Sequence, residues 1–260
     1  MSSTNGRSKA LVPLKTTVTE LARHLKPKMT VFNSRFDYYL SYAVAEEDLR
    51  QYLHEPIAAL PAAVDVLLPK VSLVLAPYLE RPNTKTVASV VTEKPADDKL
   101  ILSVAIENAD SATLFFTVKD EQVADYHYFL YDELAGLLTS RVPDTVNDAW
   151  QRLLREELSA EVHGEVDERS WRQKQALLRR PMASRRDGKP FRDYARDSFR
   201  DTMTLFLHGI CCDIDVETGP RQIPSRFLRK RLELLKSMFP PPEGHAVFPE
   251  DLRGKDRRRS

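Results

Sequence analysis

The stretch Leu100-Ile-Leu-Ser-Val-Ala-Ile-Glu107 decides the fold class predicted for this chain. Its apolar residues recur at every second position, the period of a strand that buries one face: Leu100, Leu102, Val104 and Ile106. Turn-rich connectors separate it from two further strand-like stretches, Thr86–Thr92 and Thr113–Val118. These patterns predict a three-stranded antiparallel meander with one strongly apolar face.

Helical patterns surround this sheet. Thr17 and Glu20 form a capping box, and a second helix is predicted over Arg35–His54, closed by Pro56. Beyond the sheet, apolar stripes predict further helices at Ala124–Thr139, after Pro143, at Phe191–Leu207 and at Ser225–Met238. The predicted fold is therefore α+β. A helical N-terminal part packs on the meander, and a mainly helical C-terminal half follows.

Composition shifts along the chain predict five segments. They are a disordered N-terminus (1–15), an α+β domain (16–165), a basic junction (166–190), a helical C-terminal region (191–245) and a basic disordered tail (246–260).

Acidic and basic residues are sorted along the chain. Residues 1–168 contain 17 Lys and Arg against 26 Asp and Glu, a net charge of −9, whereas residues 169–260 contain 22 against 12, a net charge of +10. The near-neutral total of +1 hides this asymmetry. The basic half could therefore bind nucleic acid, an anionic surface or the acidic half of the same protein.

The candidate binding residues are basic and lie in two clusters: Arg179, Arg180, Arg185, Arg186 and Lys189, then Arg226, Arg229, Lys230 and Arg231. Arginine suits phosphate contacts because its guanidinium presents a planar fork of donors. The competing partner is the acidic run directly upstream, Glu156, Glu157, Glu161, Glu165, Asp167 and Glu168. We favour this second partner, since a dedicated nucleic-acid binder is more often basic overall.

The run His208–Asp215 gathers the residue types that bind soft metals, with His208, Cys211 and Asp213 as candidate ligands. A structural zinc site usually needs four ligands, however, and the only other cysteine is the adjacent Cys212. We therefore expect buried structural cysteines, no metal and no cofactor. Adjacent cysteines also give no stabilising disulfide framework.

Catalytic motifs are sparse in the sequence. His127 and Tyr131 lie one helical turn apart and could form an acid–base pair, but phosphate-binding loops, hydrolase elbows and His-Glu-x-x-His motifs are missing. We therefore expect a non-catalytic interaction or scaffold protein that self-associates through its acidic and basic segments. The alternatives are a nucleic-acid-binding protein that uses the basic half, and an enzyme with a dispersed site near His127 or His208.

The most hydrophobic stretch, Ile57–Leu79, contains Asp65, Lys70 and several prolines. Charges and missing amide donors are costly in lipid, so we expect no membrane insertion. The polar N-terminus lacks the apolar run of a secretory signal, which makes a cytoplasmic location the expectation.

Overall fold

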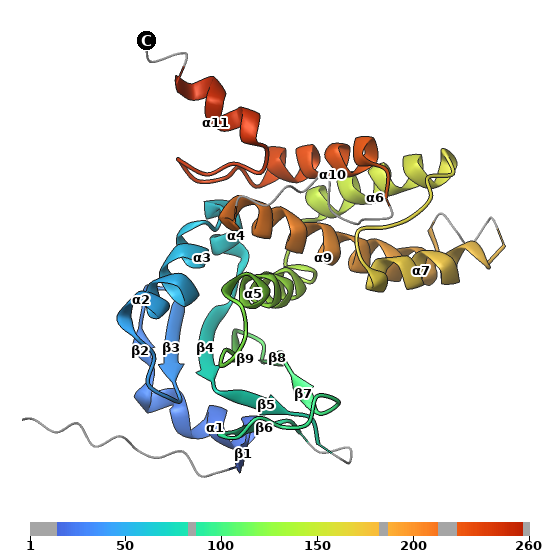
Figure 1. Ribbon diagram of the computed structural model, residues 1–260. Coiled ribbons are helices and arrows are strands. Elements are labelled where there is room, and N and C mark those ends of the chain that lie inside the picture. Colours follow the sequence, from blue (N-terminus) through green and yellow to red (C-terminus); the bar gives the residue numbers. More distant parts are fainter. Residues whose placement is uncertain (1–14, 83–86, 182–186, 213–222, 257–260) are drawn as a thin grey trace, which may run out of the picture. The chain divides into compact units, whose positions relative to one another are not determined.

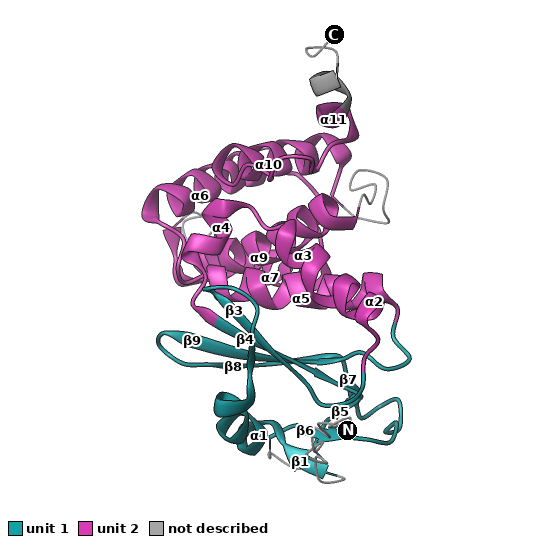
Figure 2. Cartoon of the chain, turned by 90° about the vertical axis from the view of Figure 1, so that its left-hand side faces the viewer, with its two compact units in different colours: residues 1–43, 71–121 teal, residues 44–70, 122–260 magenta. Residues whose placement is uncertain are grey.

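A computed structural model describes residues 15–82, 87–181, 187–212 and 223–256, with side chains up to residue 252. Helices and sheets both occur, which confirms the α+β class. The chain divides into two compact units (Figure 2). The first comprises residues 1–43 and 71–121, and the second 44–70 and 122–260. Among the described residues, every helix is too short or too polar to cross a lipid bilayer.

The strands form two sheets (Figure 1). The first has the order β1, β6, β5, β7, with bounds Lys15–Thr17, Ser89–Val91, Tyr78–Glu80 and Leu100–Ile101. The second has the order β2, β3, β4, β9, β8, with bounds Thr30–Val31, Phe36–Leu40, Lys70–Ala76, Ser111–Thr117 and Ser103–Glu107.

The predicted meander is only partly present. The hairpin is correct, because β8 and β9 pair antiparallel with Ser103 opposite Phe116. The strand predicted at Thr86–Thr92 is present as β6, but its predicted place in that sheet is wrong. Strand β6 pairs instead with β5 and β1. The sequence prediction missed β4 and β5, which occupy the end of the hydrophobic stretch Ile57–Leu79 and the residue that follows it. Strand β5 is the neighbour that pairs with β6.

The first helix, α1 (Val18–Leu25), begins as the sequence predicts. The Glu20 amide donates to Thr17 Oγ1 at 3.3 Å, and the Thr17 amide donates to Glu20 Oε2 at 3.4 Å, which confirms the capping box. The buried face of α1 consists of Val18, Leu21 and Leu25, spaced at helical intervals. These side chains share a core with residues of both sheets, including Val74, Ala76, Leu79, Val90 and Phe115.

The helix predicted over Arg35–His54 is wrong at both ends. Phe36–Leu40 forms β3, which pairs parallel with β4, a partner that only the tertiary structure supplies. The helical run then extends from residue 46 to residue 58 without closing at Pro56. Its three parts are α2 (Glu46–Leu49), the π-helical turn η2 (Arg50–His54) and α3 (Glu55–Ala58).

The second unit is built from helices around α9. Its remaining elements are α4 (Ala62–Leu67), α5 (Val123–Leu138), α6 (Asp144–Ser159), α7 (Glu168–Leu178), α9 (Lys189–Cys212), α10 (Ser225–Met238) and α11 (Pro249–Asp256). Helix α9 packs against α5, α6, α7 and α10. The predicted basic junction contains α7, and the predicted tail contains α11.

A buried cluster of charges joins the helices that pack on α9. Arg231 of α10 is fully buried and donates to Glu157 of α6 at 2.5 Å and to Glu165 at 2.7 Å. Glu165 also pairs with buried Lys174 of α7 at 3.1 Å, and Arg231 donates to Ser198 of α9 at 3.1 Å. The two cations balance the two carboxylates, which is the condition for burying charges without a large penalty.

Truncating Arg231 should therefore be costly. Arg231→Ala leaves two buried carboxylates facing one lysine, and we expect a loss of about 3–5 kcal/mol in the free energy of unfolding, measured with urea. The matched control is Lys230→Ala on the same helix, which breaks the half-exposed pair with Glu156 and should cost less than about 1 kcal/mol. Equal losses in the two variants would contradict the conclusion that the buried charge of Arg231 stabilises the fold more than an exposed ion pair does.

Candidate functional site

Helix α9 ends in two adjacent cysteines. The helix is buried from Asp201 through Ile210, but Cys211 and Cys212 are only half-buried. The neighbouring helix α5 places buried His127 next to them. The expectation of buried cysteines is therefore wrong, because both side chains are partly exposed.

The three side chains converge on one small volume. His127 Nδ1 lies 3.1 Å from Cys212 Sγ and 3.9 Å from Cys211 Sγ. The two sulfur atoms and the ring nitrogen all lie within 4.8 Å of one another. They come from positions that are 84 and 85 residues apart in the chain, brought together by the packing of α5 on α9.

The other ring nitrogen of His127 fixes the imidazole. His127 Nε2 lies 2.8 Å from the carbonyl oxygen of Gln51 in η2. A carbonyl oxygen can only accept a hydrogen bond, so Nε2 carries the proton. In the neutral ring, Nδ1 therefore presents its lone pair to the two sulfur atoms.

The two thiols are electrostatically unlike. A hydrogen bond from the adjacent Cys212 has the largest effect on Cys211 and, against the opposing effect of burial, its pKa is lowered to about 4. The hydrogen bond to Cys211, together with burial, raises the pKa of Cys212. Burial opposes a charge on His127, but its contacts with Cys211 and Gln51 raise its pKa overall. The pKa of Cys211 is thus shifted below the ordinary value of a thiol and that of Cys212 above it.

Two chemistries suit this arrangement. A thiolate beside an imidazole can act as a nucleophile, and two sulfurs with one imidazole nitrogen can chelate a soft metal ion. The cysteines lie at the C-terminal end of α9, where the helix dipole is negative and attracts cations. That field opposes the accumulation of negative charge and favours the binding of a cation.

The structure does not place His208, a weak candidate partner of Cys211, with the donor atoms. Its ring lies 6.0 Å from Tyr128 and 6.3 Å from Tyr131. Asp213 lies outside the described residues. The prediction weighed His127 only as a partner of Tyr131, whose hydroxyl donates to the Pro56 carbonyl at 3.0 Å. No local motif marks His127, since its connection to the cysteines is purely tertiary.

Four members of the predicted basic patch form ion pairs within the chain. Arg231 is buried and therefore is not part of any surface. Lys230 pairs with Glu156 at 2.7 Å, Lys189 pairs with Asp193 at 3.0 Å, and Arg229 pairs with Glu233 at 3.2 Å. Lys189 and Lys230 are exposed although they are paired, and Arg179, Arg180 and Arg226 are exposed as well. Arg185 and Arg186 lie outside the described residues.

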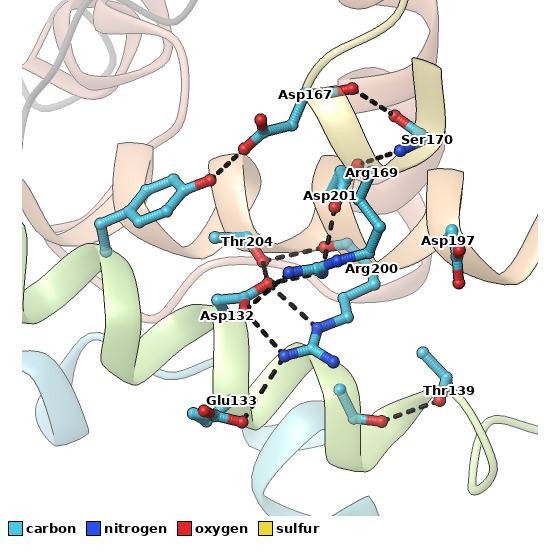
Figure 3. A network of polar contacts seen from close by, with 12 residues as sticks. Asp132, Glu133, Thr139, Asp167, Arg169, Ser170, Asp197, Arg200, Asp201 and Thr204 are labelled. Atoms are coloured by element: carbon cyan, nitrogen blue, oxygen red, sulfur yellow. Dashed lines mark hydrogen bonds and ion pairs between the residues drawn. The ribbon is translucent and has the colours of Figure 1, made fainter. Parts of the chain in front are cut away.

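A second polar network links α5, α7 and α9 (Figure 3). Asp132 of α5 accepts two hydrogen bonds from Arg169 of α7, at 2.8 and 3.0 Å, and two from Arg200 of α9, at 3.0 and 2.7 Å. The two guanidinium groups outweigh burial and lower the pKa of Asp132. Gly136 leaves room for Arg200, because a Cβ there would lie 2.9 Å from the Arg200 Cζ.

Asp201 of α9 connects this network to the first turn of α7. Its Oδ2 accepts from the Ser170 amide at 2.8 Å, and its Oδ1 accepts from Arg169 at 3.1 Å. Burial raises the pKa of Asp201 to about 6, against the opposing effects of Ser170 and Arg169. The network is internally satisfied, so we interpret it as the connection that fixes α7 and α9 rather than as a ligand site.

Comparison with known proteins gives no relative: no protein family, curated protein or solved structure matches this chain. The chemistry of the described side chains is therefore the basis for assigning a function.

The raised pKa of Asp201 predicts a pH-dependent stability. Its folded-state pKa of about 6 exceeds the ordinary value of 3.8, so its contribution is fully present at low pH and is lost as pH rises through about 6. Asp201→Asn cannot titrate. The stability of wild type relative to this variant should therefore fall by on the order of 2 kcal/mol between pH 4 and pH 7.5, measured by urea unfolding. A difference in stability between the two proteins that does not change with pH would contradict the raised pKa of Asp201.

Proposed function

We propose that the helical unit binds one thiophilic metal ion, with Zn²⁺ as the leading candidate. The observation that carries the proposal is the convergence of His127 Nδ1, Cys211 Sγ and Cys212 Sγ within 4.8 Å. The expectation of no metal was based on a count of ligands within the run His208–Asp215. The third donor instead comes from another helix, and three protein ligands leave the fourth position of a tetrahedral zinc ion open for water or another ligand.

The donor set fits such an ion. Thiolate and imidazole suit zinc and copper, whereas calcium and magnesium prefer oxygen. Binding of the ion releases the proton of Cys212, and the resulting two thiolates and neutral imidazole carry two negative charges. A divalent ion balances these charges at the negative end of α9. Histidines that bind metals usually donate their other ring nitrogen to a carbonyl or carboxylate, as His127 does to Gln51. An ion bound here would connect α5 to α9.

Zn²⁺ titration of the reduced protein in competition with a chromophoric chelator tests the proposal. We expect about one equivalent to bind, with affinity lowered at least tenfold by Cys211→Ser, Cys212→Ser or His127→Gln. Binding should also raise the melting temperature of wild type, because the ion binds the folded state.

The matched control is His163→Ala, which removes an exposed imidazole outside the cluster. This variant should bind Zn²⁺ as wild type does. Absence of binding to wild type, or equal binding by all three site variants, would overturn the proposal.

A second candidate is a non-catalytic interaction or scaffold protein that self-associates through charged segments. The supporting observation is on α7, where Trp171 and Leu178 are each 37% exposed and lie two helical turns apart. Exposed Arg179 and Arg180 follow directly. Large apolar side chains beside arginines are typical of interaction surfaces. Nucleic acid is the alternative partner for the same residues.

Charge reversal distinguishes these partners. If the arginines mediate self-association, Arg179→Glu with Arg180→Glu should lower the mass in sedimentation velocity experiments, and Glu161→Lys should restore it. The control is Arg226→Glu, which reverses an exposed charge on α10.

If the partner is nucleic acid, the double reversal should leave the mass unchanged and abolish a binding that weakens steeply with salt. A monomeric wild type that binds no nucleic acid would contradict both forms of this second candidate.

A further inference from the structure

The helical run that faces the metal site contains a proline in its interior. Pro56 lies in the first turn of α3, directly after the π-helical turn η2. Inside a helix, proline removes one amide donor, and its ring clashes with the carbonyl of the residue four positions earlier, here Tyr52. The π-helical turn widens the backbone at this position and so accommodates the ring.

The missing amide of Pro56 affects the hydrogen bonding of two carbonyls. In η2 the Glu55 amide donates to the Arg50 carbonyl, five residues earlier. The next bond of this π-helical pattern would run from residue 56 to the Gln51 carbonyl, but proline has no N–H group. The α-helical alternative, from residue 56 to the Tyr52 carbonyl, is lost for the same reason. Pro56 therefore donates neither to the Gln51 carbonyl nor to the Tyr52 carbonyl.

Helix α5 supplies donors to both of these carbonyls. Tyr126 Oη donates to the Tyr52 carbonyl at 2.9 Å, and His127 Nε2 donates to the Gln51 carbonyl at 2.8 Å. His127 is 5% exposed and Tyr126 is 2% exposed, so water does not compete strongly for these bonds. The bond from His127 places the proton of the neutral ring on Nε2. It thereby leaves Nδ1, the nitrogen that faces the cysteines, unprotonated.

We propose that Pro56 is a positioning residue of the metal site. By withholding its amide, it leaves the Gln51 carbonyl to hold His127 as the Nε2–H tautomer, with Nδ1 directed at Cys211 and Cys212. Pro56 itself contacts no ligand atom in this role. The inference rests on the proposed metal binding, but its effect on the imidazole can be measured without metal.

The test compares Pro56→Ala with Tyr126→Phe. The alanine variant restores an amide at position 56, which allows residues 50–58 to adopt the α-helical pattern in which Glu55 donates to Gln51. We expect Zn²⁺ affinity to fall ten- to a hundredfold, about the range found when the group that orients a ligating histidine is removed. Tyr126→Phe removes the parallel bond to Tyr52 and leaves His127 untouched, so affinity should change less than about threefold.

Nitrogen NMR of the metal-free protein, at a pH where His127 is neutral, gives the independent readout. Wild type should show the Nε2–H tautomer, Pro56→Ala a mixture, and Tyr126→Phe the wild-type pattern. A wild type with the proton on Nδ1 overturns the inference even if Pro56→Ala does not fold. So does an unchanged tautomer in Pro56→Ala, or an equal change in Tyr126→Phe.

Failure of the proposed function has a different signature. If wild type binds no Zn²⁺ but Pro56→Ala still shifts the tautomer, metal binding is refuted, and Pro56 remains the residue that orients His127.

Discussion

The buried guanidinium of Arg231 is the interaction on which the helical unit depends. It lies between Glu157 and Glu165, and Lys174 completes the charge balance. Because a buried charge is tolerated only when each partner is in place, this cluster constrains α6, α7 and α10 around α9 together. The position of α9 in turn determines where its C-terminal cysteines meet α5.

Many charges of the acidic and basic halves are balanced by ion pairs within the chain. Carboxylates of the acidic half, such as Asp132 and Glu156, pair with arginines and lysines of the basic half. A surface therefore cannot be inferred from the linear distribution of charge alone. The arginines that follow α7 are members of the basic half that lie exposed at the surface.

The candidate site combines two departures from regular helical structure. Helix α9 ends at the cysteines, so their side chains are half-exposed, and the helix opposite contains Pro56, so its carbonyls accept side-chain donors from α5. His127 connects the two, because its Nδ1 faces the cysteines and its Nε2 donates to the Gln51 carbonyl. Departures of this kind frequently occur at functional sites, because backbone groups freed from the helix become available to other groups.

The sequence by itself determined the α+β class, the capping box at Thr17, the β8–β9 hairpin and the span of α10, because these depend on neighbours within a few residues. It did not determine that Phe36–Leu40 would be a strand, since its parallel partner β4 lies 35 residues further on. Of the site, the sequence indicated both cysteines but not their pairing with His127. Only the tertiary structure decided that pairing and the burial of Arg231, because contacts between distant segments depend on how whole helices pack.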